Sequence, residues 1–166
     1  MMSIRTPLTD RIKKIKSKNH KCMNTKVMFS SKDMTWETPI ELFNELNDEF
    51  NFTLDPCCVS ETAKCQRYFT PETDGLSQDW SKDVVYVNPP YGREIAKWVK
   101  KSHDESKKGA TVVMLIPART DTRWFHDYIY QKAEIRFMKG RVKFLQQGVK
   151  KDSAPFPTMI VIFKRD

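Results

Sequence analysis

One stretch of the chain combines residue types that suit chemistry on an amino group: Asn88-Pro89-Pro90-Tyr91. The two prolines remove backbone donors and hold the chain extended, so the segment is stiff. The Asn88 side-chain amide and the Pro89 carbonyl are then free to accept hydrogen bonds, with the Tyr91 ring close by. Two acceptors and an aromatic ring suit a planar group with an exocyclic NH2, which would attack the methyl group of a bound donor.

The segments on either side favour this interpretation. Residues Val84 to Val87 form a β-branched and aromatic run that indicates a buried strand. The amphipathic stretch from Arg93 to Lys107 predicts a helix, with Gly109 as its C-terminal cap. Asn88 would therefore stand at the carboxyl end of a strand. An ordinary Asn-Pro turn after a core strand is the alternative that the four residues alone leave open.

Two earlier segments place polar residues where α/β proteins bind ligands. Thr38-Pro39 followed by Glu41 predicts a helix to about Phe50, with Thr38 as its N-cap. Residues Phe52 to Leu54 predict the next strand, and Asp55-Pro56 ends it. Ligands bind at the carboxyl ends of strands in open α/β sheets. Asp55 is therefore a candidate to fix the amine of a methionine moiety or to orient a water; a simple turn residue is the alternative.

The alternation of strands and helices predicts the fold class, which is α/β with a doubly wound, mostly parallel sheet. Further strands are expected at Arg67 to Phe69, Ala110 to Ile116 and Glu134 to Met138. A terminal antiparallel pair, formed by Gly140 to Leu145 and Thr158 to Phe163, is expected to complete the sheet.

Three motifs resemble, in their order, those of the adenine-N6 DNA methyltransferases: Thr38-Pro39, Asp55-Pro56-Cys57 and Asn88-Pro89-Pro90-Tyr91. Other segments are similar to the small phage-encoded Dam-type enzymes: Phe29-Ser30-Ser31-Lys32-Asp33, Trp36-Glu37-Thr38-Pro39, residues 63–69, Asp74-Gly75-Leu76, Gln78-Asp79-Trp80 and residues 116–124. The resemblance covers residues 29–163. One departure is the absence of a glycine-rich turn at residues 55–60, although the small phage enzymes also tend to lack it.

The resemblance implies the class I (Rossmann-like) methyltransferase version of the fold, S-adenosylmethionine as cofactor and double-stranded DNA as partner. Asn88, Pro89, Pro90 and Tyr91 would handle an adenine flipped out of the duplex, with Tyr91 stacked on it. The residues expected to bind the cofactor are Trp36, Thr38, Pro39, Asp55, Pro56 and Asp79. The residues expected to contact DNA phosphates are Arg119, Arg123, Arg141 and Lys143, each of which also fits a solvated surface charge.

Charge divides the chain into two parts. Residues 1–30 hold eight Lys and Arg against Asp10 alone, and therefore most of the net charge of +8. They indicate a disordered basic arm, which either binds phosphate or is a solvated tail. Residues 31–166 are expected to form a single methyltransferase domain.

The spacing of the cysteines and the pattern of apolar residues give further predictions about the class of protein. The four cysteines, at positions 22, 57, 58 and 65, match no common zinc spacing, so no metal is expected. The chain lacks a long apolar run and a secretory signal, which predicts a cytoplasmic protein without a membrane span. Methyl transfer to cytosine N4 or glutamine N5, and a non-catalytic nucleic-acid-binding protein, stay open as alternatives. The target DNA sequence and the oligomeric state are not apparent from the motifs.

Overall fold

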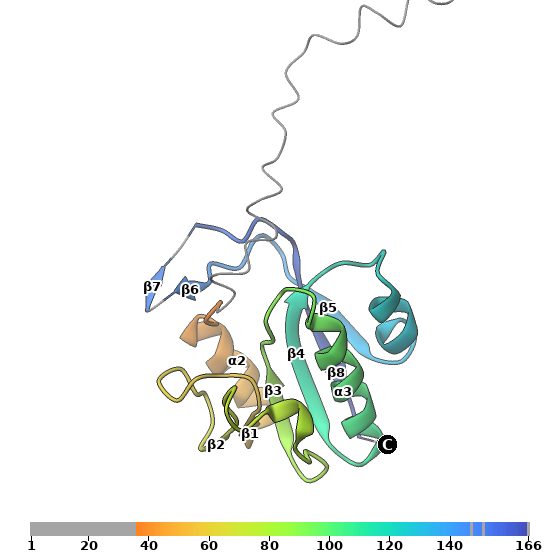
Figure 1. Ribbon diagram of the computed structural model, residues 1–166. Coiled ribbons are helices and arrows are strands. Elements are labelled where there is room, and N and C mark those ends of the chain that lie inside the picture. Colours follow the sequence, from red (N-terminus) through yellow and green to blue (C-terminus); the bar gives the residue numbers. More distant parts are fainter. Residues whose placement is uncertain (1–35, 147, 151, 166) are drawn as a thin grey trace, which may run out of the picture.

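The computed structural model describes residues 36–146, 148–150 and 152–165 (Figure 1). The predicted basic arm at residues 1–30 and the motif at 29–33 lie outside these residues. The helices are α2 (Ile40–Phe50), η2 (Gly75–Ser77), α3 (Ile95–Lys107) and η3 (Phe125–Ile129). The strands are β1 (Leu54–Asp55), β2 (Arg67–Tyr68), β3 (Val84–Val87), β4 (Thr111–Pro117), β5 (Glu134–Phe137), β6 (Leu145–Gln146), β7 (Val149–Lys150) and β8 (Thr158–Phe163).

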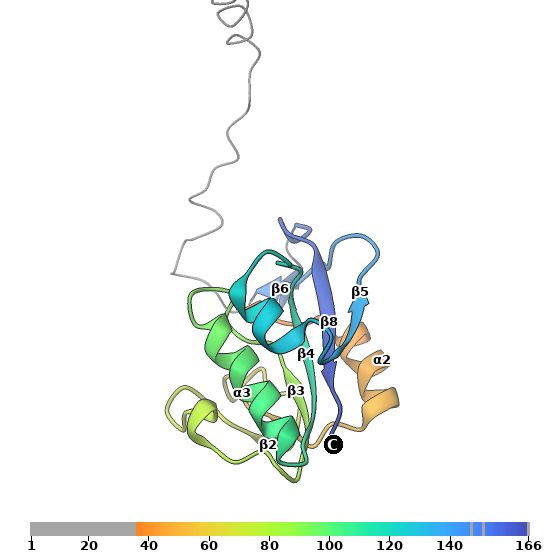
Figure 2. The same cartoon turned by 90° about the vertical axis from the view of Figure 1, so that its right-hand side faces the viewer.

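The fold is mixed α/β, built on a six-stranded mixed sheet with the strand order β2-β1-β3-β4-β8-β5. The pairs β1–β2, β1–β3 and β3–β4 are parallel, whereas β8 runs antiparallel to both β4 and β5. Figure 2 shows α3 on one side of this sheet and α2 on the other. The strands predicted around Val84–Val87, Thr111–Pro117 and Glu134–Phe137 are confirmed.

The predicted pairing of the last strand, Thr158 to Phe163, with Gly140 to Leu145 is wrong. β8 lies between β4 and β5, and residues 140–144 form no strand; the short β6 after them pairs with β7 in a separate two-stranded sheet. Every residue of β8 is buried. A strand with that pattern needs a neighbour on each edge, which β4 and β5 provide. The exposed Arg141 and Lys143 suit the surface instead.

The start of α2 also differs from the prediction. Pro39 is the N-cap, and no side chain caps the helix. The hydroxyl of Thr38 lies 2.5 Å from the Tyr86 hydroxyl instead, because Thr38 is buried against β3. Phe43 on α2 packs edge-on against the Tyr86 ring at 5.1 Å, which attaches the helix to the face of the sheet.

The central strands explain where a site can form. β3 and β4 are almost entirely buried apolar residues, as expected of parallel strands covered on both faces. Because β1, β3 and β4 are parallel, their carboxyl ends share one edge of the sheet. Asp55 and the residues that follow Val87 therefore meet at this edge.

Candidate active site

A cavity of about 570 Å3 lies at the carboxyl ends of β1 and β3. Its walls come from residues 36–38 before α2, residues 55–58 at the end of β1, residues 74–75 at the start of η2, and Asn88 with Pro90 after β3. Sites for small molecules have volumes of roughly 300–1,000 Å3, so a cofactor fits here. The structure thus brings together four of the predicted cofactor residues and part of the Asn-Pro-Pro-Tyr segment: Trp36, Thr38, Asp55, Pro56, Asn88 and Pro90.

The carboxamide of Asn88 is held in one orientation. Its Nδ2 donates hydrogen bonds to the main-chain carbonyl of Trp36 and, over 3.1 Å, to Thr38 Oγ1. Its Oδ1 accepts a hydrogen bond of 2.6 Å from the Tyr91 hydroxyl. A carbonyl oxygen has two lone pairs. Asn88 Oδ1 therefore keeps acceptor capacity for one donor of a bound substrate.

Tyr91 is buried rather than open to the cavity. Its ring packs edge-on against Phe144 and Phe156, with centroid distances of 5.8 and 5.4 Å. Its hydroxyl also lies 3.0 Å from the carbonyl of Leu115 on β4. The Tyr91 ring is not among the groups that line the cavity.

Asp55 supplies a buried carboxylate to the cavity wall. Oδ1 accepts from the Cys57 N–H at 3.3 Å, and Oδ2 accepts from the Lys64 N–H at 3.1 Å. Burial raises the pKa of Asp55 above its ordinary value, although these hydrogen bonds oppose the shift. A negative group in this position suits a cationic ligand, because charge pairing offsets the cost of burial.

Gly75 makes the closest approach in the cavity wall. A Cβ atom at this position would lie 2.0 Å from the Pro56 carbonyl oxygen, so only glycine fits. The turn after β1 lacks glycine, but the segment packed across it supplies one. In the sequence, Asp74-Gly75-Leu76 is one of the segments that carry the family resemblance, although no role is predicted for it. That segment is the sequence feature that could have pointed to Gly75.

Comparison with known proteins identifies the family. Residues 24–166 match the family described as DNA N-6-adenine-methyltransferase (Dam). A DNA N-6-adenine-methyltransferase of Haemophilus phage HP1 (strain HP1c1) is 31% identical over 140 residues, which cover 81% of this chain and 80% of the phage protein. The chain belongs to this family of DNA adenine methyltransferases.

Two further relatives agree with this assignment. A DNA N-6-adenine-methyltransferase of Escherichia phage T1 is 31% identical over 129 residues, which cover 76% of this chain and 52% of that protein. The putative methyltransferase YfdM of Escherichia coli (strain K12) is 38% identical over 63 residues, which cover 34% of this chain and 69% of that protein. The alternatives of a non-catalytic binder and of an enzyme for cytosine or glutamine therefore lose support.

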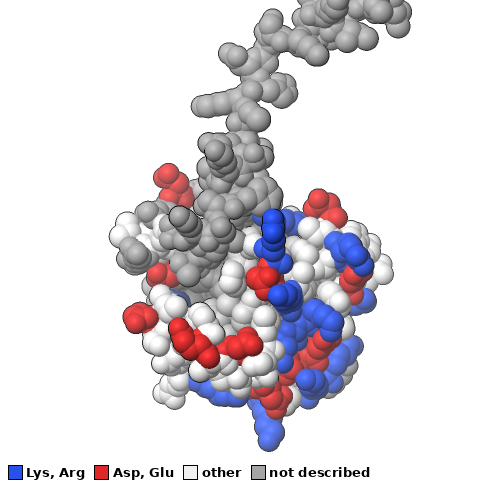
Figure 3. Space-filling view, viewed as in Figure 1, with Lys and Arg blue, Asp and Glu red and all other residues white. Residues whose placement is uncertain are grey.

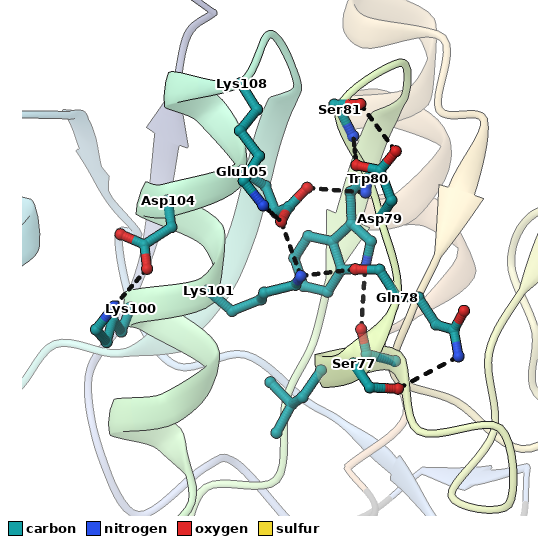
Figure 4. A network of polar contacts seen from close by, with 12 residues as sticks. Ser77, Gln78, Asp79, Trp80, Ser81, Lys100, Lys101, Asp104, Glu105 and Lys108 are labelled. Carbon is teal, nitrogen blue, oxygen red and sulfur yellow. Dashed lines mark hydrogen bonds and ion pairs between the residues drawn. The ribbon is translucent and has the colours of Figure 1, made fainter.

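A polar network in this Dam-family enzyme fixes the segment that carries Gly75 (Figure 4). Glu105 on α3 is fully buried, and its carboxylate accepts hydrogen bonds of 2.8 Å from three donors: the Trp80 N–H, Lys101 Nζ and Lys108 Nζ. Burial alone would raise the pKa of Glu105, but these donors lower it overall. The Trp80 indole in turn donates to the Gly75 carbonyl at 3.0 Å. The network therefore holds this wall of the cavity against α3.

Asp79, the predicted contact for the adenine ring of the cofactor, is not among the cavity-lining residues. Its carboxylate accepts hydrogen bonds of 3.1 Å from the Ser81 N–H and hydroxyl, which lower the pKa of Asp79. Asp74 lines the cavity, and its carboxylate accepts from the Leu76 N–H at 3.2 Å. An irregular loop has no periodicity that could tell which of the two acids faces inward.

The four predicted DNA contacts lie in two segments of the methyltransferase. Arg119 and Arg123 follow β4, the first half-buried and the second exposed. Arg141 and Lys143 are exposed and line a second, smaller cavity of about 250 Å3 together with Pro39. Neither pair lines the main cavity.

Another basic region lies on the surface beside α3, which the sequence predicts as an amphipathic helix with lysines on its polar side. Lys and Arg side chains gather on the side where α3 lies (Figure 3). Besides Lys101, which is paired with Glu105, two exposed lysines of α3 form ion pairs: Lys97 with Glu94 just before the helix, and Lys100 with Asp104 on it. Such exposed pairs contribute little to stability.

The cysteines beside the cavity are unsuited to nucleophilic chemistry. Cys57, Cys58 and Cys65 are free thiols. Burial raises the pKa of Cys58 and of Cys65 to about 12, so both remain protonated near neutral pH.

Within the described residues, no group of three His, Cys, Asp or Glu side chains is arranged to hold a metal ion. In the same part of the chain, no helix has the length and apolar character needed to span a membrane.

Proposed function

We propose that the protein transfers a methyl group from S-adenosylmethionine to N6 of an adenine flipped out of double-stranded DNA. The observation that carries the proposal is the oriented carboxamide of Asn88 beside the cavity of about 570 Å3. Asn88 Oδ1 and the carbonyl of Pro89 would accept the two amino hydrogens of the base. An adenine inside a duplex cannot reach such a site, which is why flipping is part of the proposal.

The two acceptors address the weakness of adenine N6 as a nucleophile. Its lone pair is delocalised into the ring, so it attacks poorly when the nitrogen is planar. Hydrogen bonds to Asn88 and Pro89 favour a more tetrahedral nitrogen and stabilise the positive charge that develops on it. Since Asn88 is already held by its neighbours, little reorganisation is needed at the moment of reaction. Alignment of the amine with the methyl group lowers the activation barrier further, because the reacting groups are already oriented when they meet.

The cavity residues fit the proposed cofactor. When bound, S-adenosylmethionine supplies a methyl group activated by a sulfonium, and its ammonium group needs an anionic partner. The buried carboxylate of Asp55 provides that partner. Trp36, Thr38 and Pro56 form the adjoining walls. Asp79 stays a predicted contact for the adenine ring of the cofactor, and Asp74 is a second candidate because it lines the cavity.

Asp55→Asn is expected to raise the Kd for S-adenosylmethionine by roughly 10- to 100-fold, because a charged hydrogen bond contributes about 1.5–3 kcal/mol. Burial raises the pKa of Asp55. Lowering the pH should therefore protonate Asp55 sooner than an exposed aspartate, and affinity should fall as the pH drops through that raised pKa. Calorimetric titrations at several pH values measure both effects. Asp48→Asn, at an exposed site on α2, is the control. Unchanged affinity of Asp55→Asn would contradict the assignment.

The surroundings of the site support the rest of the proposal. The parallel strands β2-β1-β3-β4, with helices on both faces, fit the doubly wound class I methyltransferase plan. Phosphate contacts from the basic side chains around the site would give binding without reading sequence. The side chains proposed for this role are Arg119, Arg123, Arg141 and Lys143. An enzyme that modifies DNA in a bacterial host would act in the cytoplasm.

The test of the function is transfer of labelled methyl from S-adenosylmethionine to unmethylated duplex DNA, followed by mass spectrometry of the nucleosides. We expect N6-methyladenine as the product. If N4-methylcytosine were formed instead, the substrate would be cytosine. If a glutamine peptide were labelled and DNA were not, the substrate would be a protein. The absence of label in every acceptor, with DNA binding intact, would reject the proposed reaction.

A further inference from the structure

Tyr86 brings a phenol hydroxyl from the central strand β3 to the wall of the cavity. The residue is 1% exposed and lines the cavity together with Asn88. Its ring packs against Phe43 and Phe52, with centroid distances of 5.1 and 5.3 Å. β3 is hydrogen-bonded to β1 on one edge and to β4 on the other. The core of the protein therefore holds this hydroxyl in place.

Thr38 needs an anchor of this kind. It lies outside any helix or strand, just before Pro39 and the start of α2. Tertiary contacts therefore determine where its hydroxyl stands. Thr38 Oγ1 lies 2.5 Å from the Tyr86 hydroxyl and 3.1 Å from Asn88 Nδ2. The same oxygen atom thus joins Tyr86 to the carboxamide of Asn88.

A count of donor protons shows what these contacts leave over. Asn88 Nδ2 carries two protons, which it donates to the Trp36 carbonyl and to Thr38 Oγ1. Thr38 and Tyr86 each carry one hydroxyl proton, and one of these lies between their two oxygens. Whichever hydroxyl donates, the other proton has no acceptor among the described residues. It is left for an acceptor in the cavity that both residues line.

In both arrangements Thr38 Oγ1 has to remain an acceptor for Asn88. A threonine side chain has three staggered rotamers, which point Oγ1 in different directions. The contact with Tyr86 favours the rotamer that also places Oγ1 beside Asn88 Nδ2. Burial raises the pKa of Tyr86 above its ordinary value, so the phenol keeps its proton near neutral pH.

From these contacts, and resting on the proposed function, we propose that Tyr86 is a positioning residue for methyl transfer. Its hydroxyl holds Thr38 Oγ1 in place, and Thr38 in turn keeps the carboxamide of Asn88 oriented for the amino group of the base.

Tyr86→Phe isolates the hydroxyl, because the ring and its packing against Phe43 and Phe52 are kept. With the full chain, saturating S-adenosylmethionine and duplex DNA, we expect the single-turnover rate of methyl transfer to fall at least fivefold. The Kd for S-adenosylmethionine should change less than threefold, because the Thr38 proton is still available to the cavity. A smaller loss of rate, or a loss that more S-adenosylmethionine restores, would overturn the positioning role. Tyr130→Phe, at a tyrosine that is 51% exposed just after η3, is the control and should keep the full rate.

Thr38→Val tests whether Tyr86 acts through Thr38. Valine has nearly the shape of threonine but no hydroxyl, so it removes the link between Tyr86 and Asn88. In this background Tyr86→Phe should change the rate less than twofold, since the contact that it removes is already absent. A larger additional loss would show that Tyr86 acts by another route and would overturn the proposal. Thr38→Ser keeps the hydroxyl, and in that background the effect of Tyr86→Phe should again be at least fivefold.

Failure of this role and failure of the proposed function give different results. A wild-type protein without methyl transfer to DNA would reject the function itself. An active wild type with a full-rate Tyr86→Phe variant would reject only the role of Tyr86. Melting curves of each variant verify that it is folded at the temperature of the assay.

Discussion

Replacing Asn88 by aspartate is expected to lower kcat by about a hundredfold to a thousandfold, the range seen when one group that stabilises a transition state is removed. The change is almost isosteric, but it exchanges a donor for an acceptor. Asn88 Nδ2 donates to the Trp36 carbonyl and to Thr38 Oγ1. A carboxylate oxygen in that position would face the lone pairs of the Trp36 carbonyl oxygen and would be repelled. The oxygen proposed to accept a hydrogen bond from the base would then turn away from its fixed orientation.

The measurement is the single-turnover rate of methyl transfer with saturating S-adenosylmethionine and duplex DNA. Asn44→Asp is the matched control, because Asn44 is exposed on α2 and the same chemical change there should leave the rate intact. Asn88→Ala, which removes the acceptor without adding charge, should be impaired over the same range. If Asn88→Asp were as fast as wild type, the donor contacts to residues 36–38 would have no part in catalysis.

The central part of the fold could be predicted because local signals agree there. The Val84–Val87 run is apolar on both faces, the two prolines end it, and an amphipathic helix follows. Each feature is determined by a few neighbouring residues. The pairing of β8 is different in kind: Thr158–Phe163 is apolar on both faces, and nothing local tells which strands will cover its edges. Tertiary packing makes that choice.

The candidate site likewise contains features that the sequence could predict and features that it could not. The positions of Asp55 and Asn88 at strand ends follow from where apolar runs stop. The role of Thr38 does not, because its hydroxyl fits a helix cap equally well until Tyr86 and Asn88 are brought within reach by the sheet. The direction of the Tyr91 side chain is likewise decided by Phe144 and Phe156, which lie more than fifty residues further along the chain.

Gly75 is the cavity residue whose importance is least visible in the sequence, and Gly75→Ala is expected to have the second large effect. The added Cβ would lie 2.0 Å from the Pro56 carbonyl oxygen, and this neighbour is backbone that cannot rotate away. Overpacking of this kind costs about 1–3 kcal/mol of folding free energy. The two segments can separate only if the turn after Asp55 moves or the Trp80 contact to Gly75 is broken.

Either movement changes the shape of the cavity proposed to hold the cofactor. We therefore expect Gly75→Ala to lower the melting temperature and to raise the Kd for S-adenosylmethionine more than tenfold, by the loss of at least about 1.4 kcal/mol of binding free energy. Gly140→Ala is the control: its φ of +79° makes the substitution strained, but nothing lies within 4 Å of the new atom. It should lose stability and keep cofactor affinity. A Gly75→Ala protein that binds S-adenosylmethionine like wild type would show that the cavity tolerates displacement of this wall, and that the close approach of Gly75 to Pro56 serves folding alone.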